Sequence, residues 1–251
     1  MSAHVRGTRK SALPVRALRS EAARMVSLRS QRTFFAIAAV ASLTLGILQV
    51  RLLPDGASAE QALRAANSGA EIGPFFVGLG AALFTASDLA TRQFGLTLLQ
   101  LNNRALVYVA KILVVLVSGA AVGAVPAVIA MWFAMSVTNR PAGATWGDVL
   151  VLPILNMGFG LLGAAIGMIA RSTAGAVFVY LASVWALPLV VAVLGIWVPA
   201  LSGPVLQFAP VTITAAMLDQ STQALAMARF TALDVVLLVV GFVRVFGWRI
   251  R

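Results

Sequence analysis

The chain has no cysteine, one histidine and two lysines among its 251 residues. With His4 as the only histidine, metal centres, thiol chemistry and histidine acid–base catalysis have almost no residues to use. Lys10 and Lys111 follow Arg9 and Ala110, so the Gly-Lys pair of a phosphate-binding P-loop is absent. There is also no Gly-x-Ser-x-Gly elbow and no His-Glu-x-x-His helix. These absences predict that the chain is not an enzyme, and they leave open only intramembrane catalysis by aspartate alone.

Charge is also scarce: 11% of the residues are charged, 60% are hydrophobic, and the mean hydropathy is +0.94. A soluble domain could not expose this composition to water. The apolar runs are long and do not alternate with polar residues, which predicts helices, because a segment in hydrocarbon must satisfy its own backbone hydrogen bonds. The predicted fold class is all-α, a polytopic membrane protein with six transmembrane helices.

The apolar segments that could cross a bilayer are residues 33–50, 72–87, 105–137, 149–170, 174–198 and 230–248. The third would be about 50 Å long as a helix, against a hydrocarbon core of about 30 Å. We therefore expect it to begin outside the bilayer and to bend at Pro126. A turn at 54–56 and a short helix at 60–66 are predicted between the first two spans. Residues 199–229 are predicted to form an outer-face segment with one short helix at 212–228.

Basic residues are distributed unequally between the two sides of this topology. Residues 1–32 carry eight basic side chains and a single acid, Glu21. Across the whole chain, 15 basic residues fall on the side of the N-terminus and 4 on the other side. This asymmetry predicts that both termini are cytoplasmic. The net charge of +11 is therefore explained by membrane topology, and it does not indicate nucleic-acid binding.

The segment before the first span is expected to form an amphipathic helix on the inner leaflet. Leu18, Ala22, Met25 and Val26 fall within one broad helical arc, and the residues outside it are Arg19, Arg24 and Ser27. The residues assigned to this interfacial helix are Glu21, Arg24, Met25 and Arg29. A disordered basic tail is the alternative. The long apolar run that follows argues against a cleaved signal peptide.

A few polar residues fall inside predicted spans, where they are functional candidates. Asp234 is a candidate for a substrate path, or alternatively for an ion pair with Arg229 or Arg51. Asn156 is a second pathway candidate, or it could hydrogen-bond between helices. Lys111 and Arg244 lie near predicted inner ends, where long side chains can reach the interface.

Two Gly-x-x-x-Gly pairs, Gly119 with Gly123 and Gly163 with Gly167, allow helix backbones to approach closely. Such pairs are more often internal packing sites than contacts between subunits. They leave both readings open and identify no function.

A polar stretch, DLATRQFGLTLLQLNNRALVYVAK at 88–111, separates two apolar runs. It resembles the cytoplasmic loop between the second and third spans of ABC transporter permeases of the type 2 exporter class. In that family an acidic residue closes the second span, a short helix follows, and Ala-Lys opens the third. The matching positions here are Asp88, Thr91, Thr97, Leu98, Arg104, Ala110 and Lys111. The sequence departs at Arg92-Gln93, where Gly-Thr is common, and at Asn102, where proline is common.

The resemblance extends to the whole layout, through the N-terminal SEAARMVSLRS and through FAPVTITAAML before the last span. It implies a permease half that pairs with a second half, identical or homologous, and with two copies of a separate ABC ATPase. ATP and Mg would bind to that ATPase, and no cofactor to this chain. The loop helix would sit in a cleft of the ATPase, with the N-terminal helix as a second contact.

The residues assigned to ATPase coupling are Asp88, Thr91, Arg92, Phe94, Gly95, Leu98, Leu99, Gln100, Arg104 and Lys111. Polar contacts are expected from Arg92, Gln100 and Arg104, and apolar packing from Phe94, Leu98 and Leu99. A short helix fixed between two membrane helices would transmit a rigid-body push.

We therefore interpret residues 1–251 as one permease domain, comprising a cytoplasmic tail and interfacial helix (1–32), a coupling loop (88–104) and an outer segment (199–229). Membrane lipids are further partners, and the apolar composition favours an apolar or amphipathic cargo, such as a drug, lipid or peptide. The preference for arginine over lysine, together with the richness in alanine, glycine and valine, indicates a high-GC bacterium and hence its cytoplasmic membrane. The alternatives are an ion-gradient-driven carrier that uses Asp234, and a non-transporting immunity or sensor subunit.

Overall fold

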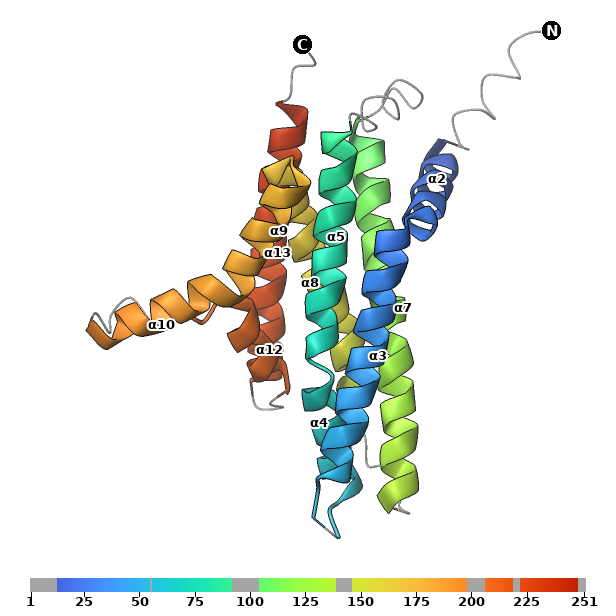
Figure 1. Ribbon diagram of the computed structural model, residues 1–251, viewed down its shortest axis with the longest axis vertical. Coiled ribbons are helices and arrows are strands. Elements are labelled where there is room, and N and C mark those ends of the chain that lie inside the picture. Colours follow the sequence, from blue (N-terminus) through green and yellow to red (C-terminus); the bar gives the residue numbers. More distant parts are fainter. Residues whose placement is uncertain are drawn as a thin grey trace, which may run out of the picture.

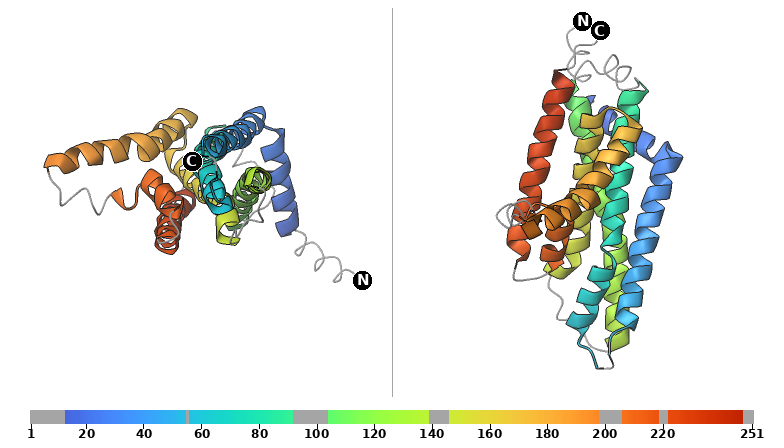
Figure 2. Two further views of the ribbon diagram at one scale, coloured as in Figure 1. Left: turned by 90° about the horizontal axis from the view of Figure 1, so that it is seen from below. Right: turned by 60° about the vertical axis from the view of Figure 1, so that its left-hand side comes forward.

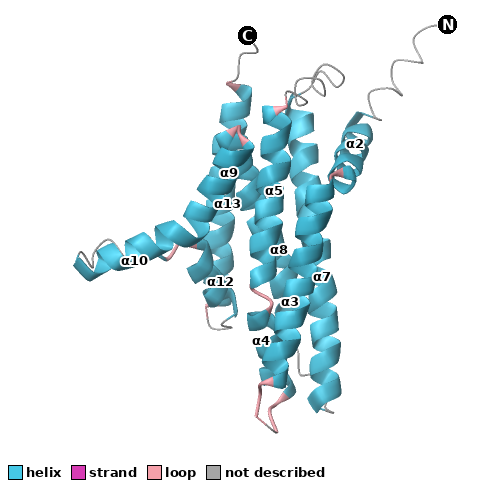
Figure 3. Cartoon of the chain, viewed as in Figure 1, coloured by secondary structure: helices cyan, strands magenta, loops and turns pink. Residues whose placement is uncertain are grey.

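The protein is a bundle of α-helices, seen here in a computed structural model that describes residues 13–54, 56–91, 104–138, 146–197, 206–218 and 222–247 (Figures 1 and 3). No strand occurs among these residues. The predicted all-α class is confirmed. The helices are α2 (Leu13–Ser27), α3 (Arg29–Arg51), α4 (Ala59–Gly69), α5 (Ile72–Ala90), α7 (Arg104–Thr138), α8 (Trp146–Ala170), α9 (Thr173–Leu181), η1 (Ala182–Ala186), α10 (Leu187–Trp197), α12 (Pro210–Leu218) and α13 (Gln223–Phe246).

Six stretches of the described chain are long and apolar enough to cross a membrane. They are Arg29–Arg51, Ala59–Ala90, Ala105–Ser136, Val149–Ala170, Thr173–Trp197 and Gln223–Val245. Their number agrees with the sequence prediction, because length and hydropathy are local properties that can be read along the chain. The architecture is that of a multi-pass membrane protein.

The long helices run side by side, with α5 and α8 in the middle, α3 and α7 on one side and α9 and α13 on the other (Figure 1). The end of α5, the start of α7 and the end of α13 lie at one end of the bundle, together with α2. Seen along the bundle, α2 lies lengthwise at its edge, next to α3 and α7 (Figure 2, left). The turn after Pro54 and α4 lie at the opposite end.

Local signals in the sequence fix several helix ends. Gly56, after Pro54, has a φ of +87° and allows the predicted turn. Ser58 and Gln61 form a capping box at the start of α4, with bonds of 2.8 and 3.2 Å. Arg171 takes a left-handed φ of 58° between α8 and α9, and the Ser172 hydroxyl then accepts a hydrogen bond from the Gly175 amide.

Glycines allow α8 to approach both α5 and α7 at backbone distance. A Cβ on Gly163 would lie 1.9 Å from the Gly78 carbonyl oxygen of α5, and one on Gly167 would lie 2.4 Å from the Ala82 carbonyl oxygen. On α7, a Cβ on Gly123 would lie 2.7 Å from the Leu152 carbonyl oxygen, and Gly119 is equally close to Asn156 of α8. Within this chain, both Gly-x-x-x-Gly pairs therefore pack helices of one subunit against each other.

The segment predicted as the fifth span, at 174–198, is bent. It consists of α9, the π-helical turn η1 and α10, and α10 projects sideways from the bundle without a buried residue (Figures 1 and 2). Pro188 has no amide hydrogen, and its ring would clash with the carbonyl of Val184, four residues earlier and inside η1. The wider π turn relieves this clash and redirects the helix.

The outer segment also differs from its prediction. The helix predicted at 212–228 is two helices: α12 begins and ends earlier, and α13 starts at Gln223 after its N-terminal cap, Thr222. Residues 198–205 and 219–221 lie outside the described part of the chain. The last transmembrane helix therefore begins about two turns earlier than apolar composition alone predicts.

The close backbone contact between α5 and α8 makes Gly163→Ala a direct test of the core. We expect it to lower the free energy of unfolding by about 1–3 kcal/mol, because the methyl group forces the two helices apart. At about 2–4 °C per kcal/mol, the loss is measurable as a lower midpoint of thermal unfolding in mild detergent.

Gly241→Ala is the matched control. The nearest atom to a Cβ at this position of α13 lies at 3.5 Å, an ordinary contact distance. Alanine also has the higher helix propensity, so its midpoint should be unchanged or slightly higher. Equal losses in both variants would contradict the tight α5–α8 contact.

Candidate functional site

Four charged side chains from three helices meet at the end of the bundle where α2 lies. The Lys111 Nζ of α7 donates hydrogen bonds to Glu21 Oε2 of α2, at 3.0 Å, and to Asp88 Oδ2 of α5. The Arg24 guanidinium of α2 donates to the other oxygen of Asp88. Two cations and two anions thus form a neutral chain of ion pairs, which we call the ionic cluster.

The ionic cluster is buried. Glu21, Asp88 and Lys111 are 3%, 1% and 2% exposed, and only Arg24 reaches the surface in part. The Lys111 ammonium also lies over the Phe84 ring, 4.1 Å from its centre. Removing charges from water costs several kcal/mol per ion, so each member depends on its partners.

Helical spacing brings these groups together. Glu21 and Arg24 are three residues apart on α2 and share the face that also buries Ala17 and Met25. On α5, Phe84 and Asp88 are four residues apart and hold the lysine between ring and carboxylate. Each helix therefore contributes one turn to the cluster.

Asp88 is poorly placed with respect to its own helix. It lies in the last turn of α5, which ends at Ala90, and the negative end of a helix dipole disfavours a carboxylate. The cations of α2 and α7 compensate for this position. The arrangement therefore depends on tertiary contacts between three helices, and α5 alone would not favour it.

The ionic cluster joins the two helices, α5 and α7, that flank the predicted coupling loop. Thr91 is exposed at the end of α5, and Arg104 is the first residue of α7. The other predicted coupling residues lie outside the described part of the chain: Arg92, Phe94, Gly95, Leu98, Leu99 and Gln100. The structure thus brings the outermost predicted residues, Asp88 and Lys111, into direct contact.

Two sequence predictions are corrected here. Lys111 does not extend to the surface, because two carboxylates hold it inside the bundle. Arg29 belongs to the start of α3 and not to the N-terminal helix, since the helical path breaks at Leu28. The structure also shows that Glu21 and Arg24 of α2 point into the bundle.

Sequence reasoning identified the cluster residues singly and missed their pairing. A signal was present: in a chain this apolar, an isolated lysine within a span requires a buried anion, and Asp88 and Glu21 are among only eight acidic residues. Arg244, by contrast, is exposed near the end of α13, and its carbonyl accepts a hydrogen bond from Arg171.

Asp234 forms a second, separate polar feature. It is 4% exposed in α13 and borders an apolar cavity of about 170 Å³ between α7, α8, α12 and α13. Its Oδ1 has no hydrogen-bond partner among the described residues. The residues that line this cavity include Met157, Met217 and Phe230.

The alternative ion pairs of Asp234 are not formed. Arg229 is five residues away on the same helix and so faces a different direction, while the Arg51 guanidinium lies over the Phe133 ring. Asn156 does not bridge helices either: its Nδ2 donates to the Leu152 carbonyl of its own helix. The tight contact of α8 with Gly119 and Gly123 explains its burial.

The comparisons with known proteins add no relative. No protein-family model, curated protein or solved structure matches this chain significantly. Among the described residues, no group of three or more acidic, histidine or cysteine side chains could hold a metal ion. The ionic cluster holds three helices together by non-covalent contacts, as a lock between them, and it is the strongest candidate for a functional feature.

Replacing Lys111 by methionine should release this lock. The change leaves Glu21 and Asp88 buried and partly unpaired, which costs about 3–5 kcal/mol when one partner of a buried pair is lost. We expect a correspondingly lower free energy of unfolding, measured by denaturant titration in mild detergent. Arg29→Met, at an exposed position of α3, is the matched control and should change stability by less than about 0.5 kcal/mol. A loss no larger for Lys111→Met than for this control would rule out the lock.

Proposed function

We propose that this chain is the membrane-spanning permease subunit of an ABC exporter. It would act with a second permease subunit, identical or homologous, and with two copies of a separate ATPase that binds ATP and Mg. The observation that carries the proposal is the ionic cluster. It joins the N-terminal helix to the two helices that flank the loop at 92–103.

In the permeases that the sequence resembles, the ATPase pushes on this loop and on the N-terminal helix. Three helices locked by buried ion pairs would receive such a push as one body, whereas separate helices would absorb it. The backbone contacts of α8 with α5 and α7 extend that rigidity along the bundle.

The positions of basic residues support a cytoplasmic location for this end of the bundle. On α2 and the start of α3, the basic residues are Arg16, Arg19, Arg24, Arg29 and Arg32. Arg104 and Lys111 lie at the start of α7, and Arg244 at the end of α13. By the positive-inside rule we assign this end, and both termini, to the cytoplasmic side of a bacterial membrane. Transport would be outward, with an apolar or amphipathic cargo.

The test of this proposal is co-purification. The tagged chain is isolated from native membranes in mild detergent, and the proteins that accompany it are identified by mass spectrometry. We expect a P-loop ATPase in near-equal amount, reduced at least tenfold by Arg104→Glu at the edge of the loop. Arg64→Glu reverses an exposed charge on α4, at the opposite end of the bundle, and should leave recovery unchanged.

Two outcomes would contradict the proposal. One is recovery of the chain without an ATPase across several detergents. The other is an equal loss of the ATPase in both charge reversals, which would indicate a general effect on the protein and not a contact at the loop.

One observation favours a second candidate, an ion-gradient-driven carrier. A buried carboxylate that borders an apolar cavity, as Asp234 does, is a typical site for a coupling ion or proton. A carrier of this kind would transport its substrate without an ATPase when reconstituted in vesicles with an ion gradient. Asp234→Asn should then abolish transport, and Arg104→Glu should leave it intact. The exporter predicts no gradient-driven transport by the chain alone.

A further inference from the structure

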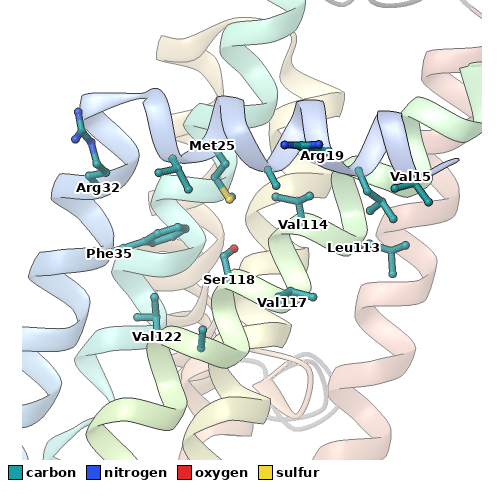
Figure 4. Close-up of a pocket in the computed structure, with 14 residues that line it drawn as sticks. Val15, Arg19, Met25, Arg32, Phe35, Leu113, Val114, Val117, Ser118 and Val122 are labelled. Carbon is teal, nitrogen blue, oxygen red and sulfur yellow. The ribbon is translucent and has the colours of Figure 1, made fainter. Parts of the chain in front are cut away.

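A deep apolar groove lies beneath α2, between α2, α3 and α7 (Figure 4). Its volume is about 760 Å³, within the range of sites that bind small ligands. Leu18 and Met25 line it from α2, Phe35 from α3, and Val114, Val117 and Val122 from α7. The α3 and α7 walls belong to stretches able to cross a membrane, so hydrocarbon chains can reach the groove from the bilayer.

Two cations border this apolar space. Arg19 of α2 and Arg32 of α3 are exposed, and neither has an ion-pair partner among the residues that the structure describes. Figure 4 shows both side chains level with α2, while Phe35, Val117 and Val122 lie deeper. The groove is therefore apolar in its depth and positively charged at its rim.

This distribution matches one class of ligand, an amphiphile with an anionic head. We propose that the groove binds an anionic phospholipid, whose acyl chains lie against α3 and α7 and whose phosphate pairs with Arg19 or Arg32. A guanidinium is well suited to phosphate oxygens, which it can bind with two parallel hydrogen bonds. A helix from a second copy fits less well, because this chain has 19 basic residues and only 8 acidic ones to offer.

A lipid in the groove would also affect the ionic cluster, because α2 contacts both. One face of α2 presents Glu21 and Arg24 to the cluster, and another presents Leu18 and Ala22 to the groove. A lipid in the groove therefore supports α2 from beneath, in the position in which its charges meet Lys111 and Asp88. Anionic lipid should stabilise that position, whether or not the chain is a permease subunit.

The experiment measures which lipids the purified chain retains. The protein is reconstituted in vesicles of equal parts phosphatidylglycerol and phosphatidylcholine, extracted in mild detergent, and analysed by native mass spectrometry. We expect bound phosphatidylglycerol to exceed phosphatidylcholine. Arg19→Gln and Arg32→Gln should each lower the ratio of bound phosphatidylglycerol to bound phosphatidylcholine by up to about fivefold. The double variant should lower this ratio further.

Two further variants separate the groove from general surface charge. Ala121→Trp places a large side chain in the groove from its α7 wall and keeps both arginines. This variant should therefore also retain less phosphatidylglycerol. Arg64→Gln removes an exposed arginine on α4, at the other end of the bundle. This variant should retain as much phosphatidylglycerol as the unmodified chain does. Equal retention of the two lipids by the unmodified chain would overturn the proposal. Full retention of phosphatidylglycerol by Ala121→Trp or by the double arginine variant would overturn it as well.

Discussion

The structure depends on the compensation of one buried cation. Lys111 is almost fully enclosed in a chain with very few charges, and its ammonium is stabilised by Glu21, Asp88 and the Phe84 ring. Because an unpaired charge in such a site is costly, the positions of α2, α5 and α7 are linked. Any movement that separates one of these helices must expose or unpair a charge, which favours movement of all three together.

Glycine packing continues that constraint along the bundle. The backbones of α5 and α7 each touch α8 where a side chain would not fit, at Gly163 and Gly123. Close-packed helices transmit displacement because they have no free volume in which to absorb it. The proposed exporter would use this property, with ion pairs at one end receiving a push and the glycine contacts passing it on. The proposed lipid in the groove beneath α2 would set how firmly this helix is held.

The features that depend on short stretches of sequence could be predicted. Long apolar runs defined the six spans, and the Pro54 turn with the helix after it followed from short-range signals. The need of Lys111 for a buried anion could be read from the sequence, but its partner Glu21 could not be singled out, because it lies 90 positions away and is brought close by tertiary packing. The bend at η1 was missed because Pro188 lies in an apolar run that hydropathy alone reads as one helix. Asp234 was recognised as a candidate, but its cavity is formed by four helices.

The central claim, that the ionic cluster holds α2 against α5, can be measured as a distance distribution. The chain has no cysteine, so Ala23→Cys and Ala90→Cys, both at exposed positions, give two unique sites for spin labels. Double electron–electron resonance should give one narrow distance in the otherwise unmodified chain and a broad distribution when Lys111→Met is added. A broad distribution without that substitution, or a narrow one that it leaves unchanged, would contradict the account.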